Sequence, residues 1–560
     1  MNENLYTDEQ ASAAEVRSAA KVEACETPEV NQRVWQTSVA AIMIVGAFLR
    51  LYDLNLVPLH HDEGVNGIFL IRLVSEGFYQ YDPQNYHGPT LYYFAALIPW
   101  ISKLLFGRSF VVTYGLTTFS IRFVTAAFGV TTIWLVLTLR RRIGTIAALG
   151  GAALLAISPG AVYLSRYFIH ETLLVFFMLS VVVATLNFYE SVRPSYLLLA
   201  AASAALAFAT KETAIVSAGV LLIALASTLV LAGLRKTHEG ESEAGNGFGR
   251  LATLQERVRS TTARLGGPLS IAILSIAALS LFLTIEILFY SSFFSNYPKG
   301  LYDALKTFEF WARTGTREHT HPWATYFVWM FKEEAPVMLL GSAGIVLALW
   351  RGSNRFAVFA ALWALGTFAA YSLIPYKTPW LMLNFLVPLA IMGGSAFEEI
   401  YKQARARKQP LAALAIAVVA FGLLSYQTLA LNFVNYDDET YVYVYAHTPR
   451  DFLRMVAEIE RLAERAGTGK QTGITVISPE YWPLPWYLRH YAFVRYAKGT
   501  TVTDDPVIIG SGNQQAPLLG LLGGRYEQIR SGLNAAGTYP LRPGIELVLF
   551  ARRDLAVQAP

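Results

Sequence analysis

The chain has 560 residues, of which 54% are hydrophobic and 15% are charged, and its formal net charge is +5. Apolar runs long enough to cross a bilayer recur along most of its length, which excludes a soluble globular enzyme and predicts a polytopic membrane protein. Its excess positive charge lies in short loops between these runs, where it would face anionic lipid, so we expect no nucleic-acid binding.

The predicted elements begin with a polar tail over residues 1–33, which lacks the apolar core of a signal peptide. A transmembrane domain follows over residues 34–433. Residues 89–106 are apolar but short and bounded by proline, which is typical of a re-entrant or interfacial helix. The α-helical spans number about eleven, at residues 34–51, 119–139, 145–164, 169–190, 195–210, 212–234, 268–292, 336–350, 355–374, 379–397 and 410–433.

Residues 434–560 are less apolar and predict a small α/β domain. Residues 449–466 have helical periodicity, with apolar side chains on one face. Short strand-like runs follow at residues 474–478, 507–510 and 546–551. Between the spans, the polar and Gly-rich stretch 236–266 predicts a flexible loop.

Basic residues indicate the orientation of the spans by the positive-inside rule. They gather on alternate loops, at residues 140–142, 235–264, 351–355 and 402–408. These loops share one side with the N-terminal tail if residues 89–106 do not cross the bilayer. The sequence therefore predicts a multi-pass protein of the plasma membrane, with its C-terminal domain and active site on the extracytoplasmic side.

Four clusters of ionisable residues fall on the predicted outer loops. They are His60–Glu63, Arg166 with His170 and Glu171, Lys211 with Glu212, and Tyr376 with Lys377. An ionisable group near hydrocarbon is costly, so several such groups on one face favour a functional site. For a single cation the alternative is a side chain that extends to the lipid headgroups, as we expect for Arg72 and Lys103.

The HHDE run also suggests a metal, but a metal site needs three or more converging ligands. No metal site is assigned, and a divalent metal is left open as the cofactor.

The chemistry of these residue types favours group transfer at the membrane surface. A partly desolvated carboxylate can act as a general base, which makes Asp62 the leading candidate, although Asp62 and Glu63 could also be a solvated pair or cap the following helix. Lys377, Lys211 and Arg122 lie near outer ends of spans, where a cation can bind phosphate or extend to the headgroups. A lipid-phosphate sugar donor needs both features, because its phosphate leaving group needs cations and the acceptor hydroxyl needs a base.

Five motifs occur in a characteristic order: DEG (62–64), HGPTLYYFAALIPWISKLLFG (87–107), SIRFVTAAFGV (120–130), SRYFIHETLLVFF (165–177) and FATKE (208–212). This order resembles the GT-C membrane glycosyltransferases, and within them the protein O-mannosyltransferase and aminoarabinose-transferase branch. The runs YKTPWL (376–381) and YWPLPWYLRHY (481–491) resemble a subfamily called flippase-associated, which is tied to archaeal-type glycosylation. The resemblance covers residues 34–400, and the C-terminal domain less securely.

The resemblance implies a mannosyltransferase-like enzyme that moves a sugar from a polyprenyl-phosphate donor to an extracytoplasmic protein, lipid or glycan. Asp62 would be the general base and Glu63 would orient the donor or acceptor, while Lys377 and the region of Arg122 would hold the carrier phosphate. His87 stands where the aminoarabinose-transferase pattern has a lysine, which puts the donor contact from this loop in doubt. The other predicted substrate-binding residues are His61, Arg166, His170, Glu171, Lys211, Glu212, His321 and Tyr376.

The alternative function is a membrane transporter or a flippase-associated protein for lipid-linked sugars. Transporters usually place ionisable residues in the middle of spans and contain internal repeats. Here the charges lie at the outer ends of spans, which favours the enzyme. The expected partners are a lipid-linked sugar donor and membrane lipid, and the sequence does not define the acceptor.

Overall fold

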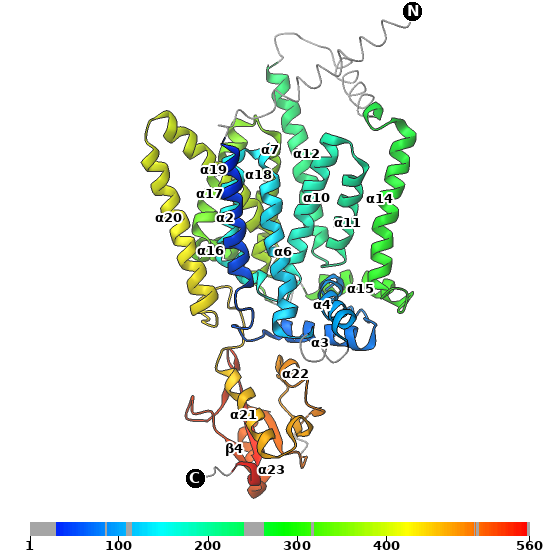
Figure 1. Ribbon diagram of the computed structural model, residues 1–560, viewed down its shortest axis with the longest axis vertical. Coiled ribbons are helices and arrows are strands. Elements are labelled where there is room, and N and C mark those ends of the chain that lie inside the picture. The colour runs from blue at the N-terminus through cyan, green and yellow to red at the C-terminus, as the bar shows by residue number, and fades with distance from the viewer. Residues whose placement is uncertain are drawn as a thin grey trace, which may run out of the picture.

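The computed structural model describes residues 30–84, 87–107, 115–239, 262–314, 319–497, 499 and 503–556. Nearly all of the predicted N-terminal tail, and most of the predicted loop at 236–266, lie outside these residues. The described chain forms a helical bundle, with a small domain that contains a β-sheet at one end (Figure 1). This arrangement confirms the predicted polytopic α-helical fold with a C-terminal α/β domain.

Eight single helices in the described residues are long and apolar enough to cross a membrane. Two bent pairs of helices are long and apolar enough only when the two helices of a pair are taken together, and α11 (Pro194–Phe208) is a shorter apolar helix. Together they correspond to the eleven predicted spans. The single helices are α2 (Gln32–Leu51), α6 (Thr118–Thr138), α10 (Glu171–Ser191), α12 (Ala214–Glu239), α14 (Gly267–Tyr290), α18 (Arg355–Leu373), α19 (Leu383–Ala406) and α20 (Pro410–Leu429).

In each bent pair the second helix has a proline in its first turn. Helix α8 (Thr145–Ala156) meets α9 (Pro159–Ser165) at 60°, and α16 (Thr325–Glu333) meets α17 (Ala335–Arg351) at 114°. The Ser158 side chain accepts a hydrogen bond from the Ala161 N–H, and Pro159 occupies the first turn of α9. A proline at this position ends the preceding helix and starts a new one.

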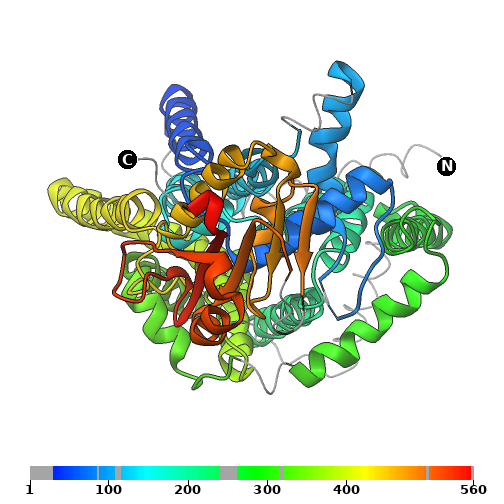
Figure 2. The ribbon, with the colours of Figure 1, turned by 90° about the horizontal axis from the view of Figure 1, so that it is seen from below.

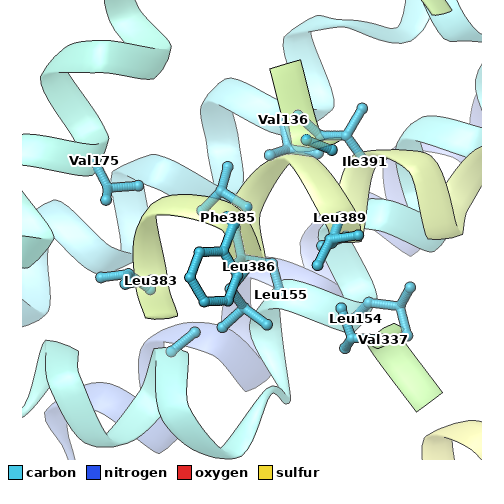
Figure 3. Packing of buried hydrophobic residues seen from close by; sticks show 14 of the residues in the cluster. Val136, Leu154, Leu155, Val175, Val337, Leu383, Phe385, Leu386, Leu389 and Ile391 are labelled. Carbon is cyan, nitrogen blue, oxygen red and sulfur yellow. The ribbon is translucent and has the colours of Figure 1, made fainter. Parts of the chain in front are cut away.

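Helix α19 forms the centre of the bundle. In the most apolar part of this span 89% of the residues are buried, whereas in the corresponding part of α14 none are buried. Leu386 and Leu389 of α19 lie among Leu155 of α8 and Val337 of α17 (Figure 3). Helices α8 and α19 approach closely because Gly394 has no side chain, since a Cβ there would lie 2.0 Å from the Ala147 carbonyl oxygen. The central helix therefore sets the positions of its neighbours.

Two helices lie at the end of the bundle that faces the C-terminal domain, namely α3 (His61–Glu76) and α4 (Thr90–Phe106). Helix α4 extends sideways in Figure 2 and is seen nearly end-on in Figure 1, so it lies across the bundle. It exposes Leu97, Ile101 and Leu104. This is the geometry predicted for an interfacial helix.

The C-terminal domain is a six-stranded sheet with strand order β2-β1-β3-β6-β4, and β5 pairs with β6. Strands β1, β2 and β3 are parallel, whereas β3, β4 and β5 each pair antiparallel with β6. The elements are α21 (Phe452–Arg465), β1 (Gly473–Val476), α22 (Leu484–Tyr487), β2 (Phe493–Tyr496), β3 (Val507–Ser511), α23 (Gln515–Leu522), β4 (Tyr526–Ile529), β5 (Tyr539–Arg542), β6 (Ile545–Arg552) and α24 (Arg553–Ala556). The domain boundaries at residues 33 and 433 stay predictions.

The YWPLPWYLRHY run attaches this domain to α3. A Cβ on Gly67 would lie 2.5 Å from the Trp486 ring, and one on Gly64 would lie 2.7 Å from Pro483. These two glycines are three residues apart, so they share one face of α3. The Tyr487 hydroxyl also accepts a hydrogen bond from the Leu59 N–H at 2.9 Å. The domain is thus seated directly over the start of α3, where the HHDE run lies.

Candidate active site

The HHDE run forms the first turn of α3. His60 Nδ1 accepts a hydrogen bond from the Asp62 N–H at 3.0 Å, and Glu63 Oε2 accepts one from the His60 N–H at 3.0 Å. Because Nδ1 is an acceptor, Nε2 carries the proton and donates to the Tyr445 carbonyl oxygen at 3.2 Å. Burial lowers the pKa of His60. His60 is therefore a neutral residue that positions Asp62.

Glu63 forms a buried ion pair with Arg122 of α6. Glu63 is 0% exposed, and its two oxygens accept hydrogen bonds from Arg122 Nε at 2.7 Å and Nη2 at 2.6 Å. The Phe168 N–H donates to the same carboxylate at 2.8 Å. The remaining N–H groups of Arg122 donate to the carbonyl oxygens of residues 54, 57 and 58. With all five donors of the guanidinium engaged, this geometry favours a structural role for both residues over the predicted roles in substrate binding.

Arg166 also contacts the main chain. Its guanidinium donates to the carbonyl oxygens of Leu49, Tyr52 and Asp53 at 2.5–3.2 Å, at the C-terminal end of α2. These are carbonyls that a helix end leaves without intrahelical partners. Arg166 is 5% exposed. Its geometry therefore favours stabilisation of the α2 end over the predicted contact with substrate.

Asp62 differs from its neighbours because its carboxylate is available. Its side chain is 43% exposed, and among the described residues no group donates a hydrogen bond to it, since the nearest imidazole nitrogen, His60 Nδ1 at 3.7 Å, is itself an acceptor. Tyr376 lies close by: burial raises the pKa of the Tyr376 phenol, and the charges of Asp62, Glu171 and Glu212 raise it further. Acidic residues from three of the four predicted clusters therefore act electrostatically on one tyrosine.

Lys377 is a buried cation next to that tyrosine. It is 1% exposed, and its Nζ donates to the Ile374 carbonyl oxygen at 2.6 Å. No carboxylate in the described part of the chain forms an ion pair with it. Burial lowers its pKa. The segment that carries Lys377 is held by its main chain, since the Lys377 N–H donates to the His319 carbonyl oxygen and the His321 N–H donates to that of Pro375.

A second group of charges joins the loop before α4 to the loop between α11 and α12. His87 and Lys211 form a β-bridge, and His87 Nδ1 lies 3.1 Å from Glu212 Oε2. Lys211 forms an ion pair with Glu171 at the start of α10, and both residues are buried. His170 Nε2 lies 3.1 Å from the Gly88 carbonyl oxygen, and burial lowers the pKa of His170 well below its ordinary value. The predicted residues of this group do come together, with Lys211 already paired to a carboxylate.

His61 contacts the C-terminal domain. Its Nδ1 accepts a hydrogen bond from Arg542 Nη1 at 2.7 Å, and Arg542 also pairs with Glu480. Sequence reasoning missed both of these residues, as well as Tyr445 and His447 near His60, because hundreds of residues separate them from α3.

His321 lies against the Trp329 ring, with 5.4 Å between ring centroids. In the described residues, no group of three or more His, Cys, Asp or Glu side chains could hold a metal ion.

Known proteins share parts of this architecture. Residues 87–238 match the family described as dolichyl-phosphate-mannose-protein mannosyltransferase. The fold is similar to the crystal structure of ArnT from Cupriavidus metallidurans bound to undecaprenyl phosphate, with a TM-score of 0.60 and 15% identity over 95% of this chain and 100% of that one. It is also similar to the apo oligosaccharyltransferase of Archaeoglobus fulgidus, with a TM-score of 0.54 and 14% identity over 87% of this chain and 70% of that one. No curated protein sequence matches the chain.

The chain is therefore a multi-pass membrane protein with the GT-C glycosyltransferase fold. The predicted resemblance to the O-mannosyltransferase and aminoarabinose-transferase branch is confirmed by the family match over residues 87–238 and by the fold. The resemblance to the flippase-associated subfamily stays a prediction.

Proposed function

We propose that the protein transfers a sugar from a polyprenyl-phosphate donor to an acceptor hydroxyl, with Asp62 as the general base. The observation that carries the proposal is an available carboxylate, Asp62, whose charge acts on Tyr376, next to which in the chain lies Lys377, a buried cation without a carboxylate partner among the described residues. A lipid phosphate as donor is supported by two proteins of similar fold. One is the ArnT structure with undecaprenyl phosphate, and the other is the archaeal AglB structure with a dolichol-phosphate.

The reaction follows from these two groups. Asp62 takes the proton of the acceptor hydroxyl as its oxygen attacks the anomeric carbon of the sugar. The bond between that carbon and the phosphate oxygen breaks, and its electron pair leaves with the polyprenyl phosphate. Lys377 stabilises the charge that develops on the phosphate. One displacement inverts the anomeric configuration. The family description favours mannose as the sugar.

The proposed site lies on the extracytoplasmic side of the plasma membrane. His60–Glu63 and the C-terminal domain are at one end of the bundle, whereas the basic loop residues 140–142, 351–355 and 402–408 are at the other (Figure 1). The positive-inside rule assigns the basic end to the cytoplasm. A lipid-linked donor would then reach the site from the outer leaflet.

The test compares Asp62→Asn with Glu76→Gln, which removes an exposed carboxylate from the other end of α3. Transfer from a synthetic polyprenyl-phosphate mannose to an acceptor should fall by about 10²–10⁴-fold in Asp62→Asn. Glu76→Gln should transfer at the wild-type rate. NMR of the product should show an inverted anomeric centre. Wild-type turnover in Asp62→Asn, or retained configuration, would overturn the assignment and favour the transporter.

A further inference from the structure

An apolar groove lies at the end of the bundle opposite the C-terminal domain. It has a volume of about 980 Å³ and lies between α2, α8, α19 and α20. Its apolar surface greatly exceeds its polar surface, and small residues such as Ala41, Gly150, Ala153 and Ala417 line it. A volume of this size is at the upper end of the range for ligand sites in proteins. No part of the proposed catalytic machinery lines the groove.

The groove is open to the surrounding lipid because α20 packs only partly on the bundle. Near its C-terminal end, the Thr428 hydroxyl donates to the Ile157 carbonyl oxygen and Phe421 stacks on Phe397. At its N-terminal end, Leu411 is 76% exposed, and Leu414, which lines the groove, is also exposed. Both ribbon views show this end of α20 away from the bundle (Figures 1 and 2). A lipid chain could therefore enter from the side.

The mouth of the groove carries two cations, Arg405 and Lys408, at the turn between α19 and α20. Neighbouring cations on this end are neutralised: Arg351 pairs with Glu399, and Lys402 pairs with Glu398. In the described ranges no carboxylate forms an ion pair with Arg405 or Lys408, and no acidic residue lines the groove. The result is an apolar slot with a positively charged mouth.

We propose that this groove binds an anionic glycerophospholipid, whose phosphate contacts Arg405 and Lys408 and whose acyl chains lie along the small residues. Basic pockets between transmembrane helices on the cytoplasmic side bind anionic lipid headgroups in this way. A free phosphate would leave the apolar slot empty, and a zwitterionic lipid would gain less from two cations. The site is separate from the proposed transfer reaction and does not depend on it.

The experiment measures lipid retention by native mass spectrometry of the delipidated full chain, exchanged with phosphatidylglycerol or phosphatidylcholine of the same acyl chains. Phosphatidylglycerol should be retained about tenfold or more over phosphatidylcholine, since each surface cation contributes about 1 kcal/mol toward an anionic lipid. The double variant Arg405→Gln, Lys408→Gln should abolish this preference. The matched control is Arg407→Gln, because Arg407 is exposed on the same turn but does not line the groove.

A second variant tests the apolar slot without any change in charge. Ala413→Phe fills the groove from α20 and should weaken retention of both lipids, while the melting temperature of each variant shows that it is folded. Equal retention of the two lipids would overturn the proposal. So would an equal effect of Arg407→Gln, preferential retention of polyprenyl phosphate over phosphatidylglycerol, or displacement of the lipid by glycerol phosphate alone.

Discussion

Neutralisation of the two adjacent carboxylates of α3 should affect two different properties of the protein. Glu63→Gln removes the counter-charge of Arg122 deep in the protein, whereas Asp62→Asn changes a half-exposed side chain that accepts no hydrogen bond from the described residues. We expect Glu63→Gln to lower stability and Asp62→Asn to lower turnover. A purely local view of the HHDE run would instead treat both residues as parts of one site.

The magnitude follows from the contacts of Glu63. Its carboxylate accepts four hydrogen bonds, from the His60 N–H, the Phe168 N–H and two groups of Arg122. A glutamine keeps the shape but offers one carbonyl oxygen, and its NH₂ faces groups that also donate. Removing one partner of a buried ion pair costs about 3–5 kcal/mol. Asp62→Asn should change the free energy of unfolding by about 0.5 kcal/mol or less.

The assay is thermal unfolding in detergent, read beside the transfer rate. Glu63→Gln should lower the apparent melting temperature by at least about 3 °C, and Asp62→Asn should not. The double variant Glu63→Leu, Arg122→Leu removes both charges and should recover part of the loss. Recovery stays incomplete because the carbonyls of residues 54, 57 and 58 lose their donor. A stable Glu63→Gln protein that fails only in transfer would refute the structural role of this pair.

Three further predictions concern the donor, the topology and the pH dependence of stability. Lys377→Ala should weaken binding of polyprenyl phosphate by about 1.5–3 kcal/mol in calorimetry, and Lys306→Ala, at an exposed lysine, should not; unchanged binding in folded Lys377→Ala would remove Lys377 from the site. Reporter fusions at residue 250 and residue 550 should report opposite compartments, and agreement between them would contradict the orientation. Burial lowers the pKa of His60, His170 and His447, so below their ordinary value of 6.5 the unfolded chain binds protons that the folded chain does not. The contribution of these histidines to stability should therefore be complete above that pH and should fall as the pH drops, by up to about 1.4 kcal/mol per pH unit for each histidine. His447→Gln should reduce the slope of melting temperature against pH. An unchanged slope would exclude His447 as a contributor.

Hydropathy alone determined the spans. An apolar run must match the thickness of the hydrocarbon whatever its neighbours are, so the eleven predicted spans all have counterparts in the structure. The short strands β2, β4 and β5 were not predicted, because four residues with mixed polarity carry no clear periodicity. The bend at residues 157–158 likewise depends on the capping contact of Ser158, which hydropathy does not register, and the bend at residue 334 lies just before Pro336.

The sequence also grouped the charged residues on one face, since each cluster stands at the end of a predicted span. It could not separate the charges that stabilise the fold from those available for chemistry. Arg122 and Lys377 look alike in sequence, as single cations near the ends of apolar helices. Only the packing of α3 against α6 brings Glu63 onto Arg122, 59 positions away, and leaves Lys377 without such a partner among the described residues. Hydropathy is summed over neighbouring residues in the sequence. The pairing of charges depends instead on distances between helices, and these distances are set only when the helices have packed.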